Sequence, residues 1–106
     1  MSMGAGLGAK AVATTRTSYA DDATFGAGNA NKVNVLARNT SRLFAVLTAP
    51  SGNKNNIRVG DSDVDTAQGI QLQAGDSMLW QCDRAVYVCA EGGVVGDNSI
   101  AMVDFT

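Results

Sequence analysis

Short runs in which apolar and polar residues alternate dominate the chain from about residue 31 onward. Within residues 69–92, GIQLQAGDSMLWQCDRAVYVCAEG, apolar side chains recur at every second position, and Gly-Asp and Asp-Arg turns separate the runs. A period of two residues is typical of a β-strand with one buried face, and Gly-Asp is a strong turn former. This stretch therefore predicts consecutive β-hairpins.

The same pattern predicts seven short strands. They cover residues 32–38, 42–48, 56–60, 69–73, 77–82, 85–90 and 99–105. The segments between them hold nearly all the Gly, Asn and Asp of this region, and no helical period is maintained. With one or two strands from the N-terminal part, this predicts an all-β fold, an antiparallel β-sandwich or jelly roll of about eight short strands.

Residues 1–30 differ in composition from the rest of the chain. Ala, Gly, Thr and Ser dominate, and the large side chains stand isolated: Met3, Leu7, Val12, Tyr19 and Phe25. Ordering this backbone costs roughly 30 kcal/mol or more in entropy, whereas burying a few such side chains returns only roughly 8–18 kcal/mol. We therefore expect an extended arm over residues 1–30 and a β-sandwich domain over 31–106. Strand addition to the arm's own sandwich or to a neighbouring molecule would hold the arm.

The alternation also assigns side chains to the two faces of each strand. The predicted inward set is Val33, Val35, Phe44, Val46, Ile57, Val59, Ile70, Leu72, Met78, Trp80, Val86, Val88, Ala101, Val103 and Phe105. Apolar residues also occupy opposite faces: Leu36, Leu43, Leu47, Leu79, Tyr87 and Met102. A solvated antiparallel sheet normally alternates more cleanly with polar residues, so the arm or another subunit is expected to cover part of this surface. Leu36, Leu43, Leu47 and Tyr87 are the candidates for a subunit interface.

Composition narrows the possible partners and the compartment. The formal net charge is −2 and the eight basic residues are scattered, which argues against nucleic acid because phosphate contacts need clustered Lys and Arg. We expect neither a membrane span nor a secretory signal, and hence synthesis in a cytosol. In that reducing setting Cys82 and Cys89 are better explained as small buried apolar side chains than as a disulfide across a hairpin.

The residues give little support to catalysis. Histidine is absent, which excludes histidine-dependent nucleophiles and histidine-bearing metal sites, and two cysteines cannot complete a structural zinc site. The carboxylates lie mostly in predicted turns, where Asp caps its own backbone. We therefore predict no enzyme, no catalytic residues, no cofactor or metal, and no small-molecule substrate.

Three local motifs have competing explanations. Asp61-Ser62-Asp63-Val64-Asp65 has the spacing that opens a calcium loop, but Thr66 replaces the required Gly and Leu72 the required Glu, which favours an ordinary acidic turn. Asn39-Thr40-Ser41 fits a glycosylation acceptor but is interpreted as a turn. The third motif is Trp80, Tyr87 and Arg84, which could form a platform for a sugar ring, although a single tryptophan in phase with strand neighbours more often packs in a core.

Several short motifs follow one another in a defined order along the domain. Asn31-Lys32 leads into an apolar strand and the Asn39-Thr40-Ser41 turn; Val59-Gly60, a Gly-x-x-Leu-x-x-Gly-Asp-Ser segment at 69–77 and a Val-Tyr-x-x-Ala strand at 86–90 follow. This order resembles that of small virion proteins of tailed bacteriophages. The polar segment 51–56 and the loop 92–98 depart from the pattern, and residues 1–30 carry no matching motif.

The resemblance implies a capsid decoration, or cement, protein. Such a β-sandwich binds the outside of a phage head, often as a homotrimer, and clamps neighbouring copies of the major capsid protein, so its location would be the virion after synthesis in the host cytoplasm. The arm residues Met3, Leu7, Val12, Tyr19 and Phe25 would then contact the capsid or a neighbouring subunit. Two other classes of function stay open: a receptor- or glycan-binding fibre module, and a connector at the base of a head fibre.

Overall fold

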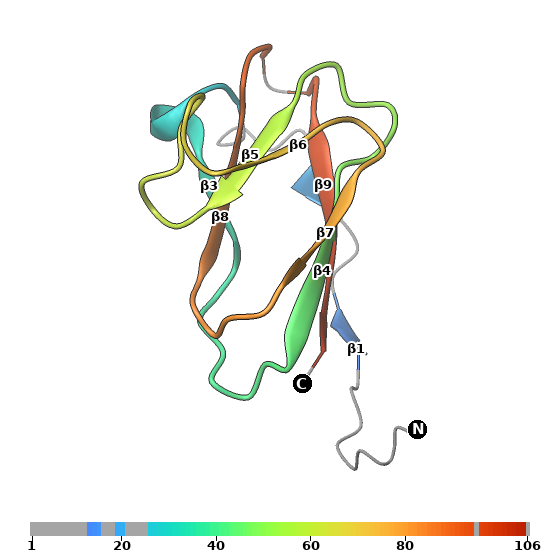
Figure 1. The fold of residues 1–106 in the computed structure, drawn as a ribbon. Helices are drawn as coiled ribbons and strands as arrows, with labels where there is room; N and C mark the ends of the chain where they lie inside the picture. Colours follow the sequence, from blue (N-terminus) through green and yellow to red (C-terminus); the bar gives the residue numbers. More distant parts are fainter. Residues whose placement is uncertain (1–12, 16–18, 21–25, 95, 106) are drawn as a thin grey trace.

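A computed structural model describes residues 13–15, 19–20, 26–94 and 96–105 and shows two antiparallel β-sheets packed face to face (Figure 1). Seven strands form the body: β3 (Val33–Leu36), β4 (Phe44–Thr48), β5 (Ile57–Gly60), β6 (Ile70–Leu72), β7 (Ser77–Trp80), β8 (Val86–Ala90) and β9 (Ser99–Phe105). The predicted all-β class is confirmed. Both ends of each of the seven predicted strands lie within two residues of the predicted bounds. The body has seven strands where about eight were predicted.

The strands form nested antiparallel pairs. β3 pairs with β8, β4 with β7 and β5 with β6, while the short strands β1 (Ala13–Thr15) and β2 (Tyr19–Ala20) both pair with β9. The resulting orders are β1-β9-β4-β7, with β2 also on β9, and β3-β8-β5-β6; we name them the β9 sheet and the β8 sheet. Of the two predicted architectures, nested pairing of this kind is typical of a jelly roll.

The described parts of the N-terminal arm contact both sheets of the same chain. In the β9 sheet, Ala13 pairs with Phe105 and Tyr19 with Ile100. On the β8 sheet, the Ala90 N–H donates to the Gly26 carbonyl over 2.8 Å, just before the 3₁₀ turn η1 (Asn29–Asn31). The chain's own sandwich is therefore one support of the arm. The predicted contact residues Met3, Leu7, Val12 and Phe25 lie outside the described residues.

The core lies between the two sheets. Its fully buried larger side chains are Leu47, Ile57, Val59, Val86, Val88, Ile100 and Met102. Four predicted inward residues of β5 and β8, Ile57, Val59, Val86 and Val88, belong to this set, and Val35 and Leu72 are also buried. Met78, Trp80 and Val33 are partly buried and pack against the core, as the alternation predicted.

In β4 and β9 the buried face is the opposite of the predicted one. Leu47 and Met102 are buried and pair across the two strands, whereas Phe44, Val103 and Phe105 are only partly covered. Both faces of these strands carry apolar residues, so the alternation does not decide which face is inside, and a change of phase by one residue exchanges them. The predicted outward orientation of Leu47 and Met102 was therefore wrong.

One further orientation was wrong for a local reason. Leu36 was predicted to face outward but is buried beside Val35, because the pairing of β3 with β8 shifts register between Asn34 and Leu36. Such a β-bulge interrupts the strict alternation of faces. Ile70 does project inward as predicted, because it pairs with the buried Val59, but it is half exposed because β6 is an edge strand.

Candidate functional site

The outer face of the β9 sheet is apolar across three strands. Cross-strand pairing aligns Phe44 with Phe105 and Val46 with both Val103 and Leu79, and paired residues project from the same side of a sheet. The Phe44 and Phe105 rings stack with centroids 4.6 Å apart and planes 20° apart. Leu79 is 57% exposed. We name Phe44, Val46, Leu79, Val103 and Phe105 the outer apolar face.

The four predicted interface candidates do not share one surface. Leu43 is exposed just before β4, whereas Leu36 and Leu47 are buried in the core. Tyr87 lies in the β8 sheet, with the Lys32 ammonium 6.0 Å from its ring centroid. The outer apolar face was not predicted from the sequence, because the alternation assigns Phe44, Val46, Val103 and Phe105 to the inside of the sandwich. The available signal was that both faces of 42–48 and 99–105 are apolar.

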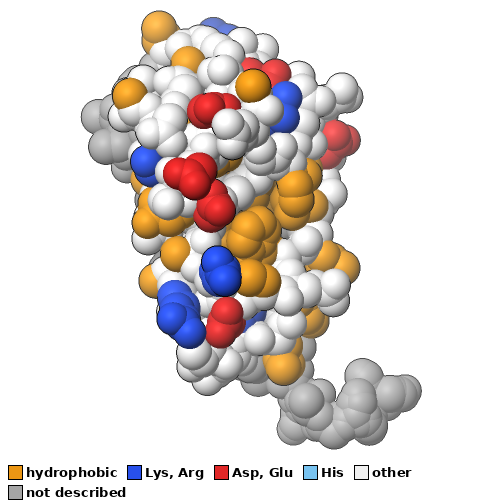
Figure 2. Space-filling model, turned by 60° about the vertical axis from the view of Figure 1, so that its left-hand side comes forward, with side chains coloured by type: hydrophobic (Ala, Val, Ile, Leu, Met, Phe, Trp, Pro, Cys, Tyr) orange, Lys and Arg blue, Asp and Glu red, His pale blue; other side chains and the backbone are white. Residues whose placement is uncertain are grey.

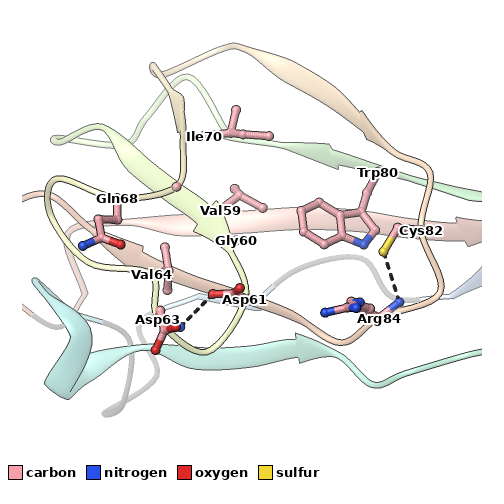
Figure 3. A pocket seen from close by; sticks show the side chains of 11 residues that line it. Val59, Gly60, Asp61, Asp63, Val64, Gln68, Ile70, Trp80, Cys82 and Arg84 are labelled. Carbon is pink, nitrogen blue, oxygen red and sulfur yellow. Dashed lines mark hydrogen bonds between the residues drawn. The ribbon is translucent and has the colours of Figure 1, made fainter.

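A second candidate surface is a cleft between the two sheets, shown in Figure 3. It encloses about 410 Å³, and we name it the inter-sheet cleft. Its apolar lining comes from Val59, Val64, Ile70 and Trp80, and its polar lining includes Asp61, Asp63, Gln68 and Arg84. Figure 2 shows a hollow with hydrophobic side chains in it and both acidic and basic side chains at its margin.

The loop between β5 and β6 forms one wall of the cleft. Asp61 and Asp65 accept hydrogen bonds from the backbone N–H groups of Asp63 and Ala67, both over 2.8 Å. The predicted acidic turn is therefore confirmed, with Asp side chains capping their own loop. The Asn29 amide ties this loop to η1, because it donates to the carbonyls of Ser62 and Val64 over 3.0 and 2.9 Å. Similarly, Asn39 accepts from the Ser41 N–H, which confirms the predicted turn at 39–41.

Trp80 and Arg84 both line the inter-sheet cleft, but Tyr87 does not. Tyr87 belongs to β8, and the flanking Val86 and Val88 are buried in the core, so its ring faces the outside of the β8 sheet. These three residues therefore do not form the sugar platform that the sequence left as an alternative, and Trp80 packs against the core as the favoured interpretation had it. The indole Nε1 of Trp80 is buried and has no hydrogen-bond partner among the described residues.

Both cysteines are free thiols, so they do not form a disulfide across the hairpin. Cys89 is buried, as predicted, and its burial raises the pKa of the thiol. Cys82 lines the cleft and is exposed, which corrects the expectation that it is buried. Its sulfur accepts a hydrogen bond from the Arg84 N–H over 3.4 Å.

The part of the chain that the structure describes has neither a metal site nor a membrane-spanning helix. No group of three or more His, Cys, Asp or Glu side chains there is placed to hold a metal ion, and no helix there is long and apolar enough to cross a membrane. Comparison of the chain with protein-family models and with curated proteins yields no match. The outer apolar face and the inter-sheet cleft are therefore the two candidate functional surfaces of the described residues.

Proposed function

We propose that this chain is a structural virion protein that binds the outside of a phage capsid and stabilises contacts between major capsid subunits. The outer apolar face is the observation that carries the proposal, together with the resemblance of the motifs from Asn31 to Ala90 to small phage virion proteins. A solvated sheet face is normally polar, and contiguous exposed apolar residues are typical of protein contact sites.

The outer apolar face is assigned to contact with another protein subunit. Leu79 and the stacked pair of Phe44 and Phe105 provide side chains that burial in an interface would stabilise. In the proposed homotrimer this face forms the subunit interface, in place of Leu36 and Leu47, which are buried in the core. A trimer attached at three related points also gains effective concentration for its second and third contacts, so individually weak contacts suffice.

The edge of β9 is assigned to strand addition. β9 is the longest strand of the described body, and one of its edges accepts the two short arm strands β1 and β2. Main-chain pairing of this kind does not depend on side-chain identity, so an extended segment of a neighbouring subunit that takes the place of β1 and β2 fits the same edge. Contacts with the assembled shell that are absent in its dissociated parts would lower the free energy of the closed capsid.

Binding to empty, expanded heads that lack the protein tests the proposal. Leu79→Lys places a charge on the outer apolar face and is expected to weaken head binding by at least about tenfold, which corresponds to about 1.4 kcal/mol. Val94→Lys is the matched control, because Val94 is 69% exposed and lies outside this face. Equal binding by the two variants would contradict the assignment of the face.

Copy number distinguishes decoration from the other structural class. A decoration protein is expected in large numbers on each virion, whereas a connector at a fibre base is present in a few copies. Quantitative gel analysis of purified virions measures the copy number relative to that of the major capsid protein.

Deleting residues 1–25 tests the role of the arm. The deletion is expected to leave a folded sandwich that no longer binds heads, and unchanged head binding would refute the role of the arm.

A further inference from the structure

We propose that the inter-sheet cleft is a second binding site and that it takes a neutral saccharide ring. The site is separate from the outer apolar face and does not depend on the proposed capsid function. Trp80 and Leu79 are neighbours on β7, so their side chains project to opposite faces of the β9 sheet. Trp80 therefore lines the cleft while Leu79 remains on the outer surface.

The cleft has the size and the lining of a small-ligand site. Its volume of about 410 Å³ lies within the range typical of ligand pockets. The half-exposed Ile70 and the indole of Trp80 provide an apolar surface against which the C–H face of a sugar ring can stack (Figure 3). This apolar surface favours a ligand with a flat, apolar ring face, but it does not determine which polar groups the ligand carries.

The polar groups of the cleft match hydroxyls better than an ion. The carboxylates of Asp61 and Asp63 are acceptors, the guanidinium of Arg84 is a donor, and the amide of Gln68 is both. Charges of both signs at one rim disfavour an anion and a cation alike. Sugar hydroxyls, by contrast, donate and accept at the same time and carry no charge.

Trp80 supplies an independent observation that points to a ligand. Its Nε1 is the one buried side-chain nitrogen or oxygen, within the part of the chain that the structure describes, that lacks a hydrogen-bond partner. Buried polar groups are nearly always paired, so such a donor calls for an explanation. Arg84 is an exposed residue that lines the same cleft as Trp80, so a ligand bound there would lie beside both side chains.

The chain provides its own reporter for the test, because Trp80 is its single tryptophan. We would titrate the full-length protein with glucose, galactose and N-acetylglucosamine and record tryptophan emission and the indole Nε1–H resonance. At least one sugar is expected to give a saturable change in both signals. Absence of a saturable change with all three sugars would overturn the proposal.

Arg84→Ala is expected to weaken sugar binding by at least about tenfold, the order of a hydrogen bond to a charged group. Arg38→Ala is the matched control, since Arg38 is an exposed arginine outside the cleft. Trp80→Phe retains an aromatic ring but loses the N–H, and calorimetry is expected to show weaker binding than in the unaltered protein. Sugar binding that Arg84→Ala and Trp80→Phe both leave unchanged would overturn the proposal.

The two proposals fail independently. Arg84→Ala should bind empty heads as well as the unaltered protein does, while Leu79→Lys should retain sugar binding. Failure of the unaltered protein to bind empty heads would count against the decoration role and leave the cleft assignment intact. Loss of sugar binding in Leu79→Lys, with its fold retained, would show that the cleft is not a separate site.

Discussion

Arg42 and Asp104 form a buried, two-point ion pair at the end of the sandwich where β9 finishes. Arg42 Nε lies 2.8 Å from Asp104 Oδ1, and Nη2 lies 3.2 Å from Oδ2. The remaining guanidinium N–H groups donate to the carbonyls of Ala37, Cys82 and Arg84 over 2.9–3.0 Å. Because the Arg42 side chain is 0% exposed and all five of its N–H groups are bonded, it joins both sheets through one buried charge.

Arg42→Ala is expected to destabilise the fold by about 3–5 kcal/mol, because it removes a buried charge that pairs with Asp104 and takes away the donors that the carbonyls of Ala37, Cys82 and Arg84 use. The measurement is the free energy of unfolding in urea. Arg38→Ala is the control: Arg38 is 70% exposed, its Nη2 is 3.9 Å from the Asp83 carboxylate, and an exposed pair of this kind contributes only about 0–1 kcal/mol. Similar losses for the two variants would refute the role given to Arg42.

The basic residue at position 42 illustrates what the sequence could not predict. An arginine beside a turn is ordinarily solvated. Its partner Asp104 lies sixty-two positions further along the chain, so no local pattern could identify the pair. The strands themselves were predictable, because turn-forming glycine, asparagine and aspartate residues separate runs in which every second residue is apolar. The buried faces of β4 and β9 were not, because Phe44 and Leu47 are equally compatible with a core. The inter-sheet cleft was not predictable either, since it joins the β5–β6 loop to Trp80 and Arg84 only in three dimensions.

Glu91 is expected to make stability dependent on pH in the acid range. Burial raises the pKa of Glu91, but hydrogen bonds from Gln71 and Arg58, with the charge of Arg58, outweigh it, so the pKa lies below the ordinary value of 4.5. A carboxyl whose pKa is depressed by folding stabilises the folded state above its unfolded pKa. That contribution is lost as the pH falls through the folded pKa.

Stability measured by urea unfolding should therefore be constant near neutral pH and decline below about pH 4.5. Glu91→Gln should lower stability at neutral pH by about 1–2 kcal/mol and make the decline in acid shallower. Some decline should remain, because the backbone N–H of Val94 also lowers the pKa of Asp97. An identical pH profile for Glu91→Gln and the unaltered protein would contradict this account.

Gly69 is expected to be intolerant of a side chain. Its φ of +110° is in the region that favours glycine, and an added Cβ would lie 2.9 Å from the Val59 carbonyl oxygen and 2.8 Å from a Val64 methyl carbon. Gly69→Ala should therefore destabilise the fold by about 2–4 kcal/mol through strain and overpacking. Gly75→Ala isolates the backbone effect, because Gly75 has a φ of +91° and no atom within 4 Å of an added Cβ. Its expected cost is about 1 kcal/mol in the free energy of unfolding. Equal costs would show that contact with Val59 and Val64 is unimportant.

Cys82 and Cys89 are expected to differ in reactivity. Cys82 is exposed beside the cleft, whereas Cys89 is buried on β8 and burial raises the pKa of its thiol, which lowers its thiolate fraction at neutral pH. With an aromatic disulfide reagent, the native protein should therefore release one equivalent of product rapidly and the second only on unfolding. Cys82→Ser should abolish the rapid phase, and Cys89→Ser should leave it unchanged. A rapid phase that survives Cys82→Ser would place an accessible thiol at Cys89 and refute the packing of β8 against the arm.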